Sequence, residues 1–296
     1  MTNDGDGPGL QLAEVIGHHR AGVYHTLTLA ASEIARQARP GQFVGLLSGP
    51  ERAYLLRRPF SIHRVDWRGA GSGSVEVVFD VVGPGTRALG WLKPHDTVDV
   101  VGPLGRPFTL PDEPASCLLV GGGYGSAPLF FLADQLRSRG CRIDFIVGAA
   151  TDERLFKALE ARRLGRTTVV TTDDGSAGRR GIVTDAMPEV LQAARSELVY
   201  ACGPMAMLAA VSQVAATAGV PCQVAVEELM ACGTGICYSC VVPMTEPGGE
   251  VRMARSCVEG PVLDGAQVAW AELGLSGGLG GGPGYPGSLA EEVVGG

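Results

Sequence analysis

The chain has 296 residues, more than a single domain usually holds, so its length favours two domains and a small additional module. Hydrophobic residues make up 45% of the chain and charged residues 19%, a globular composition, and 44 glycines and 19 prolines indicate many tight turns. A net charge of -7 without a long basic run argues against nucleic acid or an anionic membrane surface as the main partner.

The N-terminal sequence MTNDGDGPGL lacks the basic and apolar regions of a signal peptide, and no apolar stretch reaches 18 residues. We therefore expect a cytoplasmic protein without a membrane segment. Eight cysteines in a reducing compartment do not form a disulfide framework, so the close spacing of several of them favours a metal or redox site.

The first predicted domain spans residues 10–112, where short β-branched runs alternate with turns rich in glycine and proline. The expected strands are residues 22–29, 43–47, 61–65, 75–81 and 97–101. This pattern predicts an antiparallel barrel or sandwich.

The second predicted domain spans residues 113–225, where strands and helices alternate. The expected strands are 117–120, 142–147, 167–171 and 198–202, and the expected helices are 127–138, 152–159, 182–193 and 205–218. Such alternation predicts a doubly wound parallel sheet.

The alternation ends in residues 226–272, which are rich in cysteine and poor in periodic apolar runs. We interpret this segment as a small module held together by a metal centre. The glycine-rich tail, residues 273–296, has too little to bury and is expected to be disordered.

The cysteine-rich module contains Cys232, Cys237 and Cys240 on one loop, and Cys257 follows later. Their spacing is the C-x4-C-x2-C…C pattern of plant-type [2Fe-2S] ligation. Gly233 and Gly235 allow positive φ angles and a close approach of backbone amides to sulfur, and Ser239 can add a hydroxyl.

A structural zinc is the alternative for these cysteines. Zinc sites usually consist of two separated C-x2-C pairs, whereas here three ligands share one loop, so the spacing favours iron and sulfur. The cysteines at positions 117, 141 and 222 lie in apolar contexts and are interpreted as core residues.

A glycine loop lies between the first strand and the first helix of the second domain. The loop consists of Gly121, Gly122, Gly123, Tyr124 and Gly125. At this position helix N-H groups and the helix dipole face an anionic ligand, and the order of glycines is not that of the G-x-G-x-x-G dehydrogenases. We therefore predict a nicotinamide nucleotide site of the reductase type.

Two later strand ends belong to the same predicted site, because open α/β sheets bind ligands at the carboxyl ends of their strands. Asp173 follows one of these strands, and Cys202, Gly203 and Pro204 follow another. The negative charges at residues 152–153 would repel a 2′-phosphate, which favours NAD over NADP.

Several short motifs resemble those of the ferredoxin reductase-like flavoproteins. They are the R-P-F-S sequence of Arg58, Pro59, Phe60 and Ser61, the strand residues Val78, Phe79 and Asp80, and the glycine turn with Gly85 and Thr86. The resemblance implies FAD, with the arginine on the pyrophosphate, the aromatic ring against the flavin or its adenine and the serine at the isoalloxazine edge. Gly85 and Thr86 would offer backbone N-H groups and a hydroxyl to phosphate.

Alternatives to these assignments remain open on the residues alone. Arg58 can be a surface charge, Phe60 a core aromatic and Cys202 a buried thiol. The chain also departs from the reductase pattern at Asp80, where a basic residue is more usual. The C-G-P-M sequence resembles the reductase motif whose cysteine approaches the nicotinamide C4, which implies that Cys202 orients hydride transfer.

The whole order of motifs resembles the electron-transfer subunit of the NAD-dependent, two-subunit dihydroorotate dehydrogenases. Its most specific part is E-E-L-M-A-C-G-x-G-x-C-Y-x-C-V-V at residues 227–242, and the likeness covers about residues 10–270. This resemblance implies an FMN-containing catalytic partner, a heterotetramer, and electron flow through [2Fe-2S] and FAD to NAD+ in pyrimidine biosynthesis.

Two other functions are compatible with the same motifs. One is a nicotinamide-dependent reductase subunit of another complex, of the sulfhydrogenase or ferredoxin-NADP reductase type. The more distant one is a redox-sensing or metal-stabilised binding module without enzymatic activity. The presence of flavin and iron-sulfur absorbance separates the last from the others, and the identity of the partner separates the first two.

Overall fold

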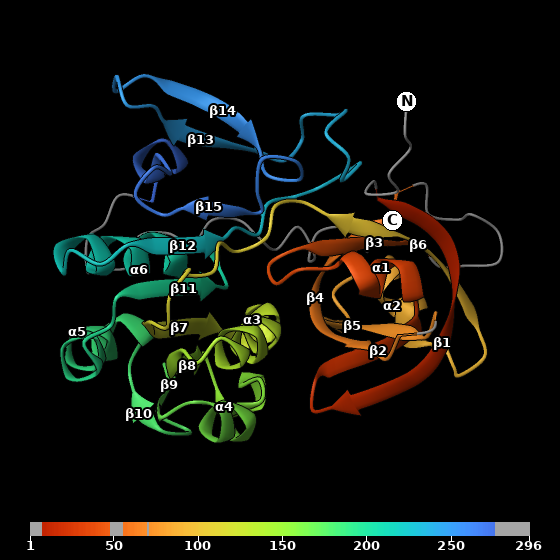
Figure 1. Cartoon of the computed structure of the whole chain (residues 1–296), viewed down its shortest axis with the longest axis horizontal. Helices are drawn as coiled ribbons and strands as arrows, with labels where there is room; N and C mark the ends of the chain where they lie inside the picture. The colour runs from red at the N-terminus through yellow and green to blue at the C-terminus, as the bar shows by residue number, and fades with distance from the viewer. Residues whose placement is uncertain (1–7, 48–55, 70, 276–296) are drawn as a thin grey trace, which may run out of the picture.

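Six antiparallel strands close into a barrel in the N-terminal part of the computed structural model, which describes residues 8–47, 56–69 and 71–275 (Figure 1). Around the barrel the strands are β1 (Gly9–Ala21), β2 (Tyr24–Ala30), β5 (Gly73–Asp80), β4 (Arg58–Trp67), β3 (Phe43–Leu47) and β6 (Thr97–Leu104). Two short helices, α1 (Ser32–Gln37) and α2 (Pro84–Gly90), connect strands. The prediction of an antiparallel barrel is confirmed.

Strand β1 is the barrel strand that the sequence did not reveal. Its inward side chains include the small Ala13 and Val15, which are buried, whereas Leu10, Leu12 and Ile16 face outward and are exposed. Because the larger apolar side chains lie on the solvent side, the alternation that marks a half-buried strand is inverted here. The interior is filled by side chains such as Leu27, Leu29, Val75, Val77 and Phe79.

A seven-stranded sheet follows the barrel. In spatial order its strands are β10 (Arg179–Arg180), β9 (Thr167–Thr172), β8 (Arg142–Ala149), β7 (Ser116–Gly122), β11 (Leu198–Cys202), β12 (Cys222–Ala225) and β15 (Val262–Asp264). All neighbours pair in parallel except β12 and β15. The predicted doubly wound architecture is confirmed.

Four helices cover the two faces of this sheet. Buried side chains of α3 (Ala127–Ser138) and α4 (Ala158–Leu164) pack into one core cluster, and those of α5 (Val183–Ala194) and α6 (Met205–Thr217) pack into another. The two short 3-10 helices η1 (Gly123–Ser126) and η2 (Asp152–Arg154) stand at the ends of β7 and β8. The apolar strands are thus buried between helices on both sides.

The helix predicted over residues 152–159 is wrong. A 3-10 turn ends at Arg154, Phe156 inserts its buried ring into the core, and Lys157 adopts a left-handed backbone with φ 47° before α4 begins. The left-handed residue cannot continue a right-handed helix, so the helix starts later than the apolar pattern suggests.

The cysteine-rich module forms a two-stranded hairpin of β13 (Val241–Thr245) and β14 (Val251–Arg255), followed by β15 and the 3-10 helix η3 (Trp270–Leu273). Its side chains Val242, Met244 and Ala254 join the core cluster of α5 and α6. The interpretation that a metal alone holds the module is therefore corrected, because hydrophobic burial contributes as well. The predicted disordered tail lies outside the described residues from 276 onward.

The barrel and the seven-stranded sheet meet at a buried histidine. His63 of β4 has no exposed surface, its Nδ1 lies 2.7 Å from the Ala127 carbonyl oxygen, and Lys157 Nζ lies 2.8 Å from its Nε2. Nδ1 is therefore the protonated nitrogen, which donates to the carbonyl, and Nε2 accepts from the lysine. Burial lowers the pKa of His63 to about 3, and the charge of Lys157 acts in the same direction.

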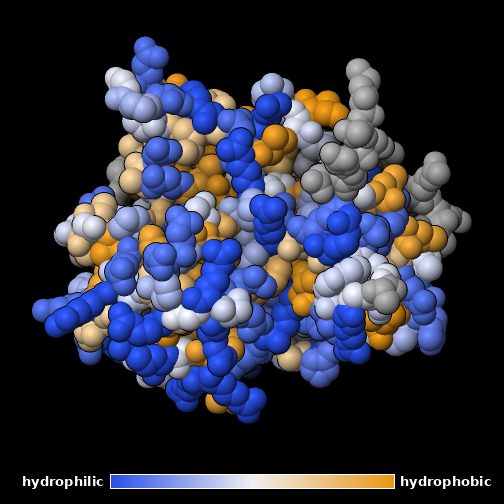
Figure 2. Space-filling model, in the orientation of Figure 1, coloured by the Kyte–Doolittle hydropathy of each residue, from blue (hydrophilic) through white to orange (hydrophobic). Residues whose placement is uncertain are grey.

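The outer surface of the molecule is mixed. Figure 2 shows hydrophilic side chains over the lower part of the view and hydrophobic ones around the cysteine-rich module and on the outside of the barrel. None of the helices within the described ranges has the length and apolar character needed to cross a bilayer.

Candidate functional site

The four module cysteines form two adjacent pairs. The side chains of Cys232 and Cys237 interact with each other, those of Cys240 and Cys257 do the same, and Cys232 acts electrostatically on Cys257. Cys240 and Cys257 are buried, whereas Cys237 is exposed. Among the described side chains, no three His, Cys, Asp or Glu residues converge as ligands of one metal ion. Two pairs side by side suit a centre of two metal ions, one pair for each.

Backbone amides surround the first of these sulfurs. The N-H groups of Thr234, Ile236 and Cys237 point at Cys232 Sγ from 3.4–3.5 Å. Burial acts to raise the pKa of Cys232, but these hydrogen bonds outweigh it and lower the pKa to about 6. A hydrogen bond with Ser239 lowers the pKa of Cys237, which shifts this thiol toward the thiolate form that binds metal.

Two glycines give the cysteine loop its shape. Gly233 and Gly235 have φ angles of 69° and 86°, which confirms the predicted positive φ at both positions. A Cβ atom on Gly235 would lie 2.6 Å from Val258, and its carbonyl accepts a hydrogen bond of 2.9 Å from Arg255 Nη1. The predicted hydroxyl is also in place, since Ser239 Oγ lies 3.2 Å from Cys237 Sγ.

The buried cysteine pair touches the barrel. Cys240 and Cys257 pack against Phe43 of β3 and Leu104 of β6 in one hydrophobic cluster. In the β3–β4 ladder Phe43 stands opposite Ser61, the last residue of the R-P-F-S motif. The predicted ligand cysteines and the predicted flavin motif are therefore separated by the width of one barrel strand.

On the barrel, the predicted pyrophosphate residues come together at the start of α2. The Arg58 side chain lies over Gly85 so closely that a Cβ there would sit 2.2 Å from Arg58 Nε. The Thr86 hydroxyl accepts from the amides of Val82 and Gly83 at 3.0 and 3.1 Å and donates to the Gly83 carbonyl. Thr86 therefore holds the turn, and its hydroxyl is not directed at a ligand.

The other flavin residues divide between two faces of their strands. Phe79 is buried in the barrel core, stacked on His25 and 5.5 Å from the half-buried Phe60 ring. Val78 is buried in the core cluster on the sheet side. Asp80, which is partly exposed, reaches across to Arg154 Nη1 at 3.4 Å. Of the three residues predicted on β5, Asp80 alone has a polar group at the barrel surface.

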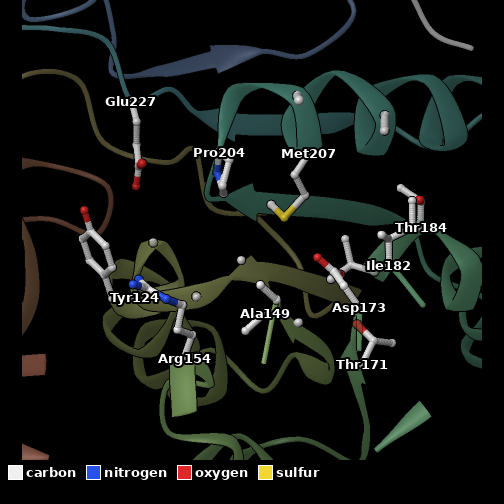
Figure 3. A pocket seen from close by; sticks show the side chains of 18 of the residues that line it. Tyr124, Ala149, Arg154, Thr171, Asp173, Ile182, Thr184, Pro204, Met207 and Glu227 are labelled. Atoms are coloured by element: carbon white, nitrogen blue, oxygen red, sulfur yellow. The ribbon is translucent and has the colours of Figure 1, made fainter. Parts of the chain in front are cut away.

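A cleft of about 500 Å³ lies at the carboxyl ends of β7, β8, β9 and β11 (Figure 3). The predicted nicotinamide residues that line it are Gly122, Gly123, Tyr124, Gly125, Asp173 and Pro204. The structure thus brings the glycine loop and the two later strand ends together. Asp152 and Glu153, predicted to repel a 2′-phosphate, lie in η2 and are not among the lining residues, whereas the carboxylate of Asp173 is.

Close backbone packing explains the glycines of the cleft. A Cβ on Gly125 would lie 2.7 Å from the Gly203 Cα, and one on Gly122 would lie 2.7 Å from Met207 Sδ. Gly203 itself has a φ of 152°. The loop after β7 and the loop after β11 therefore lie so close together that a side chain would not fit between them. Glycines allow this approach, and the backbone of both loops lies beside the cleft.

Cys202 lies behind the cleft. It is 1% exposed, and burial followed by the nearby carboxylate of Glu227 raises its pKa well above the usual value. The thiol therefore stays protonated. The Glu227 side chain lines the cleft, yet the protein atoms around its carboxylate displace much of its water. This desolvation raises the pKa of Glu227. Burial also raises the pKa of Tyr124 to about 12, with Glu227 adding to the shift.

Most of the other lining residues were not predicted as site residues from the sequence. Three of them matter for the chemistry of the cleft: Tyr24 from the barrel, Arg154 from η2 and Glu227 from the connection to the cysteine-rich module. Glu227 follows β12 by two residues, so the rule of strand carboxyl ends would have indicated it had that strand been predicted. No local pattern marks Tyr24, whose place in the site depends on how the barrel meets the sheet.

Two family models match the chain. Residues 227–269 match the iron-sulfur cluster binding domain of dihydroorotate dehydrogenase B, and residues 119–213 match the oxidoreductase NAD-binding domain. The first match covers the cysteine loop and the hairpin, and the second covers the glycine loop and the strand ends of the cleft.

Whole-chain relatives agree with these matches. The dihydroorotate dehydrogenase B (NAD(+)) electron transfer subunit of Desulforamulus reducens is 39% identical over 81% of this chain and 90% of its own length. That of Geobacillus thermodenitrificans is 38% identical over 82% and 92%. A solved structure of NADH-dependent reduced ferredoxin-NADP oxidoreductase is similar with a TM-score of 0.76 and 34% identity, over 90% of this chain and 92% of the other. The chain belongs to the family of dihydroorotate dehydrogenase B electron transfer subunits.

Proposed function

We propose that this chain carries electrons from the FMN of a dihydroorotate dehydrogenase catalytic subunit through [2Fe-2S] and FAD to NAD+. The reaction would take place in the cytoplasm and serve pyrimidine synthesis. Family membership supports the proposal, since the relatives named above are NAD(+)-dependent electron transfer subunits.

Cys232, Cys237, Cys240 and Cys257 would hold the iron-sulfur cluster. Their arrangement in two pairs, with amides directed at the first sulfur, fits two iron ions better than a single zinc. The amide hydrogen bonds stabilise negative charge on sulfur and so favour binding of the metal. They would also favour the uptake of an electron.

FAD would lie along β4, with its diphosphate beside Arg58 at the start of α2. The Arg58 guanidinium lies directly over Gly85, at the first turn of this helix, which supports this position. Pro59, Phe60 and Ser61 continue along the strand toward Phe43. A bound flavin exchanges a hydride with nicotinamide and single electrons with a cluster, so it converts between the two.

The nicotinamide nucleotide would occupy the cleft. Amides of the glycine loop face its phosphates, and the Asp173 carboxylate can accept hydrogen bonds from ribose hydroxyls and repel a 2′-phosphate, which supports NAD over NADP. Cys202 would act as a neutral packing group behind the nicotinamide ring and orient it, since its buried thiol holds its proton.

One observation carries the proposal: Phe43 packs on Cys240 and Cys257 and pairs across the ladder with Ser61. This contact supports a cysteine centre beside the strand proposed to bind flavin. The cleft also borders the barrel, because Tyr24 of β2 lines it. The three sites would therefore form one short chain of electron carriers.

The exposed side of the cysteine loop would face the catalytic subunit. Leu229, Ile236 and Tyr238 on this loop expose 83%, 79% and 60% of their surface. Figure 2 shows hydrophobic side chains at the upper edge of the molecule, where the loop lies in Figure 1. Apolar and aromatic groups around an electron port are typical of a protein interface.

The proposal is tested by co-expressing the chain with the FMN-containing catalytic subunit of its own organism. We expect FAD, iron and sulfide in the purified complex and dihydroorotate-dependent reduction of NAD+. The chain alone should reduce artificial acceptors with NADH but should not oxidise dihydroorotate. Turnover of dihydroorotate by the isolated chain would contradict the proposal.

A second candidate function is a reductase subunit of an electron-bifurcating complex. The 34% identity to the structure of NADH-dependent reduced ferredoxin-NADP oxidoreductase favours it, since that likeness extends over 90% of this chain. A pull-down from the native organism separates the two functions. An FMN-containing dihydroorotate oxidase among the captured proteins supports the first, and a larger ferredoxin-linked flavoprotein supports the second.

A further inference from the structure

Arg154 is the one cation among the described residues that line the cleft. The other charged side chains there are Asp173 and Glu227. A dinucleotide brings two negative charges on its diphosphate into a site of this kind, and backbone amides alone leave them partly uncompensated. Arg154 is therefore the side chain of the cleft that can neutralise part of the diphosphate charge.

The backbone of Arg154 is fixed beside the glycine loop. The Tyr24 hydroxyl donates a hydrogen bond of 2.8 Å to the Arg154 carbonyl oxygen. A Cβ on Gly123 would lie 3.7 Å from that hydroxyl and 3.8 Å from that carbonyl. Arg154 therefore lies beside the glycine loop, and Figure 3 shows its side chain next to Tyr124.

The guanidinium is held from the opposite side by the barrel. Arg154 Nη1 lies 3.4 Å from Asp80 Oδ2, and the Asp80 side chain is 16% exposed whereas that of Arg154 is 55% exposed. One edge of the planar group is therefore occupied by the carboxylate, and its remaining N-H groups stay available. An arginine anchored in this way loses little conformational freedom when an anion binds.

We propose that Arg154 binds a phosphate of the nicotinamide dinucleotide and that Asp80 positions it for this contact. The inference rests on the proposed function of the cleft. Asp80 belongs to the barrel, whereas Arg154 and the glycine loop belong to the seven-stranded sheet. Binding of the dinucleotide would therefore fasten the two parts together at the place where nicotinamide and flavin must meet.

The diphosphate of FAD offers the same chemistry from a second source. Arg58 already lies at the start of α2, on the barrel side, whereas Arg154 lines the cleft. The position of Arg154 therefore favours the nicotinamide nucleotide. FAD content and NAD+ affinity are measured separately, so that each source has its own readout.

The test uses the flavin-loaded full chain and its variants Arg154→Gln, Arg154→Lys and Asp80→Asn. Arg142→Gln is the matched control, because Arg142 is exposed at the opposite end of β8. Titration calorimetry with NAD+ gives the Kd, and the absorbance of flavin released by denaturation gives the FAD content.

We expect the Kd of Arg154→Gln to rise about 10- to 100-fold, since a charge-assisted hydrogen bond is lost. Arg154→Lys should recover part of the loss, and Asp80→Asn should weaken binding by less than about tenfold because the charge remains but is no longer held. The Kd of wild type should rise with ionic strength more steeply than that of Arg154→Gln, a difference that a merely structural arginine would not produce.

Two results would overturn the inference while leaving the function of the cleft intact. One is an unchanged Kd in Arg154→Gln. The other is loss of FAD at unchanged NAD+ affinity, which would assign the arginine to the flavin instead. If the loaded wild type binds no NAD+ at all, the proposed function fails, and the inference fails with it.

Discussion

The cysteine centre and the nicotinamide cleft are built in opposite ways. Three of the four cysteines and the amides that face them lie within residues 232–240 of one loop. The cleft draws its lining from the barrel, from successive strand ends of the sheet and from the connection to the module. Most of the first site comes from one short segment of the sequence, whereas the second combines residues that are far apart in the sequence.

This difference decides how each site should respond to mutation. A local site fails by losing a ligand, while the rest of the molecule keeps its own cores. A distributed site responds to changes at distant positions, because its geometry depends on how the barrel is fixed against the sheet. The following changes test the contrast, beginning with the largest expected effect.

Cys237→Ala should remove iron and sulfide completely while FAD content stays unchanged. The module keeps hydrophobic packing through Val242 and Met244, so we expect it to remain folded without its cluster. Iron and sulfide analysis beside flavin absorbance measures both quantities, and Cys141→Ala is the control among the buried cysteines. If FAD were lost together with iron and sulfide, the cysteine centre would not be structurally independent of the flavin site.

Gly85→Ala should weaken FAD binding about 10- to 100-fold, the cost of overpacking one methyl group. The new Cβ would displace the end of the Arg58 side chain, which is flexible, so the fold should survive. Gly83→Ala is a matched control, since a Cβ there meets nothing within 4 Å. Fluorescence titration with FAD gives both affinities, and equal values would remove Arg58 from the flavin site.

His63→Asn should reduce the loss of stability between pH 6.5 and 5. The folded protein holds the pKa of His63 at about 3, below its unfolded value of 6.5, so the unfolded state binds a proton first as pH falls. The contribution of His63 to stability is full above pH 6.5 and decreases as the pH falls toward 3, with a loss of about 2 kcal/mol between pH 6.5 and 5. Asparagine can donate to the Ala127 carbonyl but does not titrate. Urea unfolding of wild type and variant at pH 6.5 and at pH 5 tests this prediction. An equal decrease in the free energy of unfolding of the two proteins would contradict it.

Glu227→Gln should give the smallest change, a small gain of stability at neutral pH. Desolvation raises the pKa of Glu227 in the folded state, so folding disfavours its ionised form, and stability is lost as pH rises through the raised value. Glutamine removes that loss. The difference between variant and wild type should grow from pH 4.5 upward in thermal unfolding, and a constant difference would show that Glu227 is not desolvated.

The contrast between the two sites also explains what the sequence revealed. The cysteine spacing, Gly233 and Gly235 could be interpreted from adjacent residues, because the loop forms its own bonds. The strand ends of the cleft followed from the topology of parallel sheets. Tyr24 could not be predicted, since only the contact between barrel and sheet brings it to the cleft. Arg154 follows the end of β8, but its contact with Asp80 of the barrel has no signal in the sequence.

The fold shows the same limit. Strongly apolar elements between clear turn signals were predicted closely, as for α3 and β11, which have the expected bounds. Strand β1 was missed because its large apolar side chains face outward, and the helix after β8 was misplaced because Lys157 takes a left-handed conformation. In both cases tertiary packing overrides the local pattern.

The pairing of strand β15 limits where this protein can be joined to another in a chimera, by design or by recombination in evolution. It belongs to the cysteine-rich module, yet it is the last strand of the seven-stranded sheet and covers the outer edge of β12. A chimera joined at residue 226 would leave that edge open to aggregation. The module and the sheet should therefore be transplanted as one piece, and the segment between β6 and β7 is the better place for a junction.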